Sequence, residues 1–246
     1  MPKTRKYAVK IKDPIAFQIE RAALKMSLEA TRTEGIAYDS YQAEKNEHKL
    51  RIAHSTTMSY SISSIITVIA AIEGMLNEFY LKGTDTITMR LGHNMANVTK
   101  SALSRWVDAY GENGPEMKNG LIRKTQYLLE LAELPKMDPG REPLQSLKIL
   151  IRLRNEIVHS YPAYRYAHSP EQKDIDPLQK ALQGKFTPSL IADPTDPFLW
   201  QRCLSAGCAQ WAMKTENSYR NELFNLLGIP IHSELPPYKP DLSQNH

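Results

Sequence analysis

Residues 58–80, MSYSISSIITVIAAIEGMLNEFY, decide the fold class of this 246-residue chain. The apolar side chains in this stretch recur at alternating spacings of four and three residues, so they form one stripe along a helix. We therefore expect a long helix that faces a hydrophobic core. The stripe consists of Met58, Ile62, Ile65, Ile69, Ile72, Leu76 and Phe79.

Helical periodicity extends over most of the chain, and the alternation that is typical of strands is scarce. The expected fold class is therefore all-α. Glycine and proline residues mark the breaks between the helices. The further helices that the spacing predicts are 14–33, 38–54, 95–110, 117–134 and one that begins at Pro143.

Proline becomes more frequent in the C-terminal third of the sequence. Six prolines in residues 162–197 predict mostly loop, with one short helix near residues 177–183. Asp196 and Pro197 then form a helix start, because aspartate is a good N-cap and proline suits the first helical position. This last helix is expected to end at Gly228.

The composition is that of a soluble globular protein, with 41% hydrophobic and 24% charged residues, a net charge of +4 and a pI near 8.9. The most apolar window, residues 62–76, contains Glu73 and is shorter than the roughly 20 residues that cross a bilayer. The N-terminus lacks the apolar core of a signal peptide. Cys203 and Cys208 are expected to be reduced, partly buried thiols on different faces of a helix. We expect a cytoplasmic protein without a membrane span.

A second stretch, residues 154–161 (RNEIVHSY), indicates chemistry at the end of a long apolar helix. Arg154 falls near the centre of the apolar arc of that helix, where an unpaired charge costs several kcal/mol. Glu73 lies inside the apolar face of the other strongly apolar helix. We therefore predict that Glu73 pairs with Arg154, with Glu78 as the alternative partner.

Three polar side chains lie on one edge of the helix beside Arg154, namely Arg152, Asn155 and His159. A guanidinium binds phosphate through two parallel hydrogen bonds, and an imidazole moves a proton near neutral pH. Such a set suits the handling of a phosphodiester. The alternative for His159 is a structural role, because the helix macrodipole favours a histidine at a helix C-terminus.

This pattern resembles the HEPN superfamily (higher eukaryotes and prokaryotes nucleotide-binding domains). The signature of that superfamily is an arginine, four to six residues and a histidine, often with asparagine after the arginine. Arg154, Asn155 and His159 match it, and Tyr161 extends the match to the arginine-x4-histidine-x-tyrosine pattern of HepT-type toxins. The resemblance covers about residues 56–163.

The resemblance implies a helical bundle that dimerises and cleaves RNA without a metal ion or another cofactor. His159 would act as the general base, and the His159 of a second copy would protonate the leaving oxygen. Arg154 would stabilise the charge on the phosphoryl oxygens. Asn155 would orient His159 or the phosphate.

Aromatic and basic side chains follow the motif directly. The resemblance makes Tyr161 a modification target, whereas the simpler alternative is that Tyr161 packs against the helix it follows. Tyr164 and Arg165 could stack a base and contact a phosphate. A loop packed on the bundle is the alternative for these two residues.

The leading hypothesis is a ribonuclease that acts as a toxin or anti-phage defence effector. Its expected partners are RNA, a second copy of the chain, and an antitoxin or inhibitor protein. The alternative is a non-catalytic HEPN-like helical protein that binds nucleotide, RNA or a partner protein, because fold does not determine function. The expected domain division is an N-terminal helical extension (1–55), a HEPN-like core (56–163) with an insertion around 81–120, a proline-rich connection (164–196), a C-terminal helix packed on the core (197–228) and an extended tail (229–246).

Overall fold

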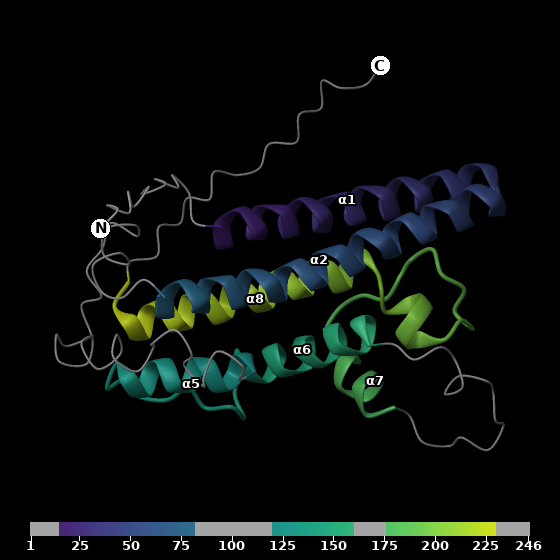
Figure 1. The fold of residues 1–246 in the computed structure, drawn as a ribbon. Helices are drawn as coiled ribbons and strands as arrows, with labels where there is room; N and C mark the ends of the chain where they lie inside the picture. Colours follow the sequence, from purple (N-terminus) through teal and green to yellow (C-terminus); the bar gives the residue numbers. More distant parts are fainter. Residues whose placement is uncertain (1–14, 82–119, 160–175, 230–246) are drawn as a thin grey trace, which may run out of the picture.

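The computed structural model describes residues 15–81, 120–159 and 176–229. Within these residues all regular structure is helical and no strand is present, so the all-α prediction is confirmed (Figure 1). The elements in chain order are α1 (Ile15–Glu44), α2 (Glu47–Leu81), α5 (Leu121–Leu131), α6 (Leu144–Val158), α7 (Pro177–Leu182), the π-helical turn η2 (Phe198–Arg202) and α8 (Ala206–Leu227).

Helices α1 and α2 form a long antiparallel hairpin that turns at Lys45 and Asn46. Lys45 adopts a left-handed φ of 54°, and the Asn46 side chain accepts the backbone N–H of Lys49 at 3.1 Å and so caps α2. Helix α8 packs against both helices of the hairpin, and α6 packs against α2 and α8. Figure 1 shows that the turn end of the hairpin extends beyond α6 and α8.

Small and acidic side chains form the inward face of α1. The buried positions follow the four-and-three spacing of a coiled-coil seam. At the end of this seam the Glu34 carboxylate accepts the backbone N–H of Ala206 at 2.9 Å and that of Leu190 at 2.8 Å. Helix α1 therefore satisfies an N–H group that the start of α8 would otherwise leave unpaired. The buried positions are Ala16, Glu20, Ala23, Ser27, Ala30 and Glu34.

The apolar stripe of α2 supplies much of the core. Helix α2 is long and apolar enough, by length and composition alone, to cross a membrane. The buried part of its apolar stripe packs against α5, α6 and α8 in one cluster. Met58 and Ile62 are half-buried, and the fully buried members are Ile65, Val68, Ile69, Ile72, Leu76 and Phe79.

The limits of the first two helices differ from the prediction. The sequence predicts helices over 14–33 and 38–54, whereas α1 continues through Gly35 to its end at Glu44. A glycine inside a helix costs only about 1 kcal/mol relative to alanine, and the packing of α1 on α2 and α8 outweighs that cost. The boundary predicted between residues 55 and 56 falls inside α2.

The C-terminal third follows the prediction in two places and departs from it in one. Helix α7 is the short helix expected near residues 177–183, and the last helix ends at Gly228, which has a left-handed φ of 68°. That helix does not begin at Pro197, because the chain forms η2, breaks, and restarts with Ser205 as the N-cap of α8. The predicted helix at 95–110, nearly all of the insertion around 81–120, and the tail after residue 229 lie outside the described residues.

Candidate functional site

Helix α6 carries the motif, and leucines anchor its inner face. Four leucines are buried against the core, where α6 contacts α2, α7 and α8. Each buried leucine side chain contributes about 1.5–3 kcal/mol of hydrophobic stabilisation. The helix is therefore a firm base for the polar side chains on its outer face. The four leucines are Leu144, Leu147, Leu150 and Leu153.

The outer face of α6 brings together Arg152, Asn155 and His159, as the helical spacing predicts. All three residues are exposed. Their separations of three and four residues place them above one another on a helix. His159 is the C-cap of α6, and its backbone N–H donates to the carbonyl oxygen of Asn155 at 2.9 Å. This bond keeps His159 beside Asn155 rather than turning it toward Arg154.

Arg154 lies on a different face of α6 from His159. Five residues at about 100° each separate the two side chains by about 140° around the helix. Arg154 is half-buried, and among the described residues its guanidinium forms no hydrogen bond or ion pair. Within one copy of the chain, the two main residues of the motif therefore point in different directions.

The predicted ion pair between Glu73 and Arg154 is wrong. Glu73 Oε1 instead lies 3.3 Å from the Nζ atom of Lys124 on α5, which also donates to Asn77 Oδ1 at 3.1 Å. The Lys124 side chain is 1% exposed and that of Glu73 is 45% exposed. Because a buried ammonium without a partner would cost several kcal/mol, Glu73 has a structural role as the solvent-side partner of this cation.

Lys124 was not identified from the sequence as a buried cation, although its position relative to the neighbouring leucines indicates burial. It lies three residues after Leu121 and four before Leu128, both of which are buried. That spacing places Lys124 on the apolar face of α5. A lysine in such a position is the natural partner for a glutamate on the apolar face of α2.

A second buried charge cluster, also missed, joins α1 to α8. Arg220 forms ion pairs with Glu20 and, at 3.4 Å, with Glu216. Burial raises the pKa of Glu216 to about 7, the charge of Arg220 lowers it, and the charge of Glu20 raises it. One guanidinium is thus shared by two buried carboxyl groups. The heptad spacing of α1 would have indicated that Glu20 is buried.

Cys203 and Cys208 lie together, which corrects the prediction that they occupy different faces of one helix. Both are free thiols, and both are fully buried. Burial raises the pKa of the Cys208 thiol well above its ordinary value, and a hydrogen bond with the Cys203 thiol raises it further. The break before Ser205 removes the helical separation that the prediction assumed. The Cys208 thiol is therefore a poor nucleophile, because the thiolate is the reactive form.

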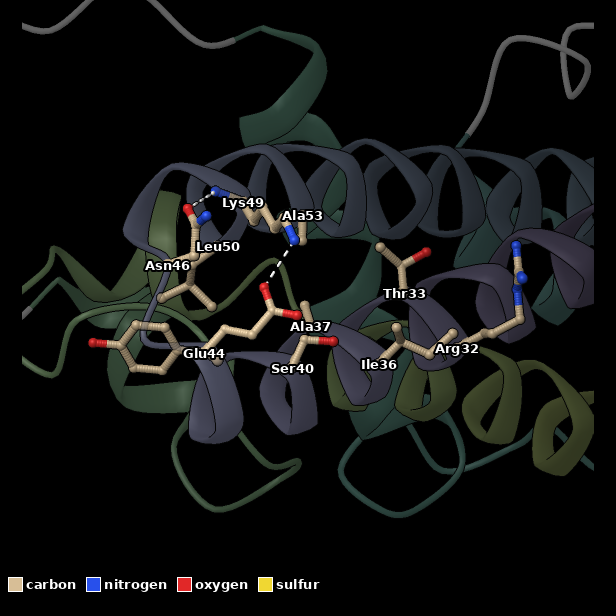
Figure 2. Close-up of a pocket in the computed structure, with 11 residues that line it drawn as sticks. Arg32, Thr33, Ile36, Ala37, Ser40, Glu44, Asn46, Lys49, Leu50 and Ala53 are labelled. Carbon is tan, nitrogen blue, oxygen red and sulfur yellow. Dashed lines mark hydrogen bonds and ion pairs between the residues drawn. The ribbon is translucent and has the colours of Figure 1, made fainter.

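Three hollows lie elsewhere on the described part of the molecule. The first, of about 280 Å³, lies between α1 and α2 near the hairpin turn (Figure 2). The second, of about 590 Å³, lies beside the start of α6, and the third, of about 770 Å³, lies beside the loop at residues 190–196. None of the three is lined by Arg154, Asn155 or His159. The motif residues therefore lie on an open helix face outside these hollows.

No metal site is found in the part of the chain that the structure describes, where no three histidine, cysteine, aspartate or glutamate side chains are grouped to hold an ion. Tyr161, Tyr164 and Arg165 lie outside the described residues. Their predicted roles in modification and RNA contact stay predictions.

Comparison of the chain with protein families, with curated proteins and with solved structures gives no match. The resemblance of residues 154–161 to the HEPN superfamily therefore stays a prediction. The function of this chain has to be inferred from its own residues.

Proposed function

We propose that this chain is a metal-independent endoribonuclease of the HEPN type, with its active site on α6. The supporting observation is that His159 and Asn155 lie exposed on one turn of α6, with Arg152 on the same face. An exposed imidazole flanked by an amide and a guanidinium can reach a phosphodiester from solution. The guanidinium binds phosphate, and the imidazole exchanges a proton near neutral pH.

In the proposed reaction the ribose 2′-oxygen attacks the adjacent phosphorus, and the bond from phosphorus to the 5′-oxygen of the next nucleotide breaks. His159 takes the proton from the 2′-hydroxyl, and the His159 of a second copy gives a proton to the leaving 5′-oxygen. The products carry 2′,3′-cyclic phosphate and 5′-hydroxyl ends. Water and metal ions take no part in this step.

The half-buried position of Arg154 fits a role across a two-fold interface. In the proposed dimer, Arg154 of one copy contacts the phosphate beside the 2′-hydroxyl that His159 of the other copy deprotonates, so the two residues need not converge within one chain. Arg154 then stabilises the charge that builds on the phosphoryl oxygens. Asn155 orients His159 or the phosphate.

The proposed biological role is that of a cytoplasmic toxin or anti-phage defence effector. RNA is the substrate, and a second copy of the chain completes the active site. An antitoxin or inhibitor protein is the further partner that such a role requires.

The test compares the wild-type chain with His159→Ala. Both are expressed in bacteria from an inducible promoter, growth is scored and RNA ends are sequenced; purified proteins are then incubated with RNA. Wild type is expected to produce 2′,3′-cyclic phosphate ends, and His159→Ala to lose at least about a hundredfold in rate. His48→Ala, at an exposed position on α2, is the matched control and should keep full activity. Equal cleavage by wild type and His159→Ala would contradict the proposal.

A second candidate function is a non-catalytic helical protein that binds nucleotide, RNA or a partner protein. The divergence of Arg154 and His159 by about 140° favours it, because a binding surface does not need the two to converge. The same purified proteins separate the two candidates. Wild type that binds RNA but leaves it intact, at concentrations where it is dimeric, would favour the binding protein.

A further inference from the structure

Helix α8 does not reach the turn end of the α1–α2 hairpin, which contacts η2 and the 190–196 loop instead: His54 Nε2 lies 3.1 Å from the Gln201 carbonyl oxygen, and Tyr38 and Tyr41 line a hollow with that loop. Glu34 accepts the first backbone N–H of α8, so α8 begins level with Glu34. Beyond that level α1 continues to Glu44, and Figure 1 shows this part of the hairpin extending past α8. Large apolar side chains are exposed here, with Ile36 57% and Ile52 56% exposed. These side chains leave apolar surface in water where neither α8 nor η2 covers the hairpin, and exposed apolar surface can mark a contact site.

Figure 2 shows the hollow on this part of the hairpin, with Ile36 at its rim. Small side chains of both helices line it, including Ala37, Ser40 and Ala53. A projecting isoleucine beside a shallow hollow of small residues is the arrangement of a knob beside a hole. The same surface therefore carries both halves of a helix-packing contact.

Charges of opposite sign lie at the two ends of this hollow. Arg32 lies at one end (Figure 2), and it pairs with Glu29 at 3.0 Å. Glu44 lies at the other end, where it pairs with Lys49 at 2.8 Å (Figure 2). Arg32 and Glu44 are twelve residues apart on one helix, so they are separated by about 18 Å along its axis.

We propose that this face of the hairpin binds a second copy of the same chain through a two-fold axis. The two hairpins lie antiparallel across the axis and form a four-helix bundle. The hollow and its rim, defined by Arg32, Ile36, Ser40, Glu44 and Ala53, are the contact surface. The surface is complementary to itself, which an isologous interface requires.

The two-fold arrangement fixes the register of the two copies. With the axis level with residue 38 of α1, Arg32 of each copy meets Glu44 of the other. Ile36 of each copy then meets Ser40 and the hollow of the other. At each end the Arg32–Glu29 pair of one copy lies beside the Glu44–Lys49 pair of the other. Negative and positive side chains then alternate in the order Glu29, Arg32, Glu44, Lys49. Exposed ion pairs contribute at most about 1 kcal/mol alone, but across an interface they select the register.

Charge exchange tests this register on the full chain. Arg32→Glu and Glu44→Arg each place like charges at both ends of the interface, so each is expected to raise the dimer dissociation constant about tenfold or more. The double variant Arg32→Glu/Glu44→Arg restores opposite charges across the axis and is expected to dimerise like wild type. Sedimentation velocity over a range of protein concentrations measures this, and circular dichroism checks that each variant is folded.

A second pair of variants tests the apolar contact. Ile36→Glu buries a charge in the proposed interface and is expected to abolish the hairpin contact, which leaves only the contact through α6 that the ribonuclease proposal requires. Leu190→Glu is the matched control, because Leu190 is 54% exposed but lines the hollow beside the 190–196 loop, and it should stay dimeric. A monomeric wild type would overturn the proposal. So would an Ile36→Glu protein that associates as strongly as wild type, or a double charge variant no tighter than the single ones.

This proposal does not depend on the ribonuclease proposal, because its residues lie on α1 and α2 and the proposed active site lies on α6. If the wild type cleaves RNA but the hairpin variants do not change self-association, only the hairpin interface is overturned. Self-association through the hairpin without RNA cleavage would overturn only the ribonuclease.

Discussion

Glu216 is the side chain through which the free energy of unfolding is expected to respond to pH near neutrality. Burial raises its pKa from the ordinary 4.5 to about 7. Between these values the folded chain holds a proton that the unfolded chain has released, so the free energy of unfolding falls as pH rises through this window. Below and above the window Glu216 adds no slope. Glu216→Gln is expected to remove this fall, which amounts to about 3 kcal/mol.

Urea unfolding at about pH 5 and about pH 8 measures the effect as the difference between two free energies. Glu222→Gln is the matched control, since Glu222 is exposed on the same helix, and its pH dependence should equal that of wild type. Arg220 keeps Glu20 as a partner in the Glu216→Gln protein. An unchanged fall in Glu216→Gln would show that the buried carboxyl group does not hold its proton in the folded state.

At the scale of single residues, the sequence showed which side chains were unusual but not what they contact. Glu73 was recognisable because a carboxylate in an apolar stripe breaks the pattern. Its partner is Lys124 and not Arg154, because partner choice depends on which helix faces α2 at that level. The shared face of Arg152, Asn155 and His159 was predictable, since it depends only on spacing within one helix.

Two glycines give opposite predictions at the scale of the helix. Gly35 lies inside α1, and a Cβ atom there would meet nothing within 4 Å. Gly35→Ala is expected to raise the free energy of unfolding by about 0.5–1 kcal/mol, because alanine restricts the unfolded chain and favours helix. At Gly207, in the first turn of α8, a Cβ atom would lie 2.4 Å from the Thr187 carbonyl oxygen.

Gly207→Ala is therefore expected to lower the free energy of unfolding by about 1–3 kcal/mol. The Thr187 backbone cannot move away freely, because its carbonyl oxygen accepts the Ser205 hydroxyl at 2.9 Å. Thermal or urea unfolding of the two variants, side by side with wild type, measures both signs. Stabilisation by Gly207→Ala would mean that Thr187 is not held against α8.

At the scale of the element, the sequence predicted a helix end correctly where the residues at that end determine it. It failed where packing against another element determines the end. The end of α8 and the start of α7 are determined by the residues at those positions. Gly228 ends α8 because it adopts a left-handed φ, and Pro177 begins α7 because Asp176 caps it. The passage of α1 through Gly35 is not local, since it depends on neighbouring helices. The break at Ser205 is not local either, because Glu34 of α1 binds the new helix start.

The described part of the molecule combines a well-packed centre with a hairpin end that α8 does not reach. Periodicity predicted the all-α class, because it reports that each helix has an apolar face. It could not predict that α8 lies against both helices of the hairpin, or that the hairpin continues beyond it. Those features depend on which apolar faces meet, and the spacing within one helix carries no such information.

Hydrogen exchange should report this contrast along the chain. Amides of residues 65–76, at the centre of α2, are surrounded by the core and should open only with global unfolding. Amides of residues 36–52 lie around the hairpin turn, where large apolar side chains are exposed, and should exchange at least about tenfold faster. Peptide-resolved exchange measured by mass spectrometry on the Ile36→Glu variant gives these rates without a second copy bound at the hairpin. Residues 144–153 of α6 serve as an internal control for core-like protection.

The same experiment on wild type connects local stability to assembly. If a second copy covers the hairpin, raising the protein concentration should slow exchange in residues 36–52. Binding then stabilises the folded turn end of the hairpin by mass action. Exchange in residues 65–76 should stay the same, since those amides are already protected by the core. Equal protection of both segments in Ile36→Glu would mean that the end of the hairpin is stable by itself. In that case the turn end of the hairpin would not need a second copy for its stability, and the exposure of Ile36 and Ile52 would not be evidence for one.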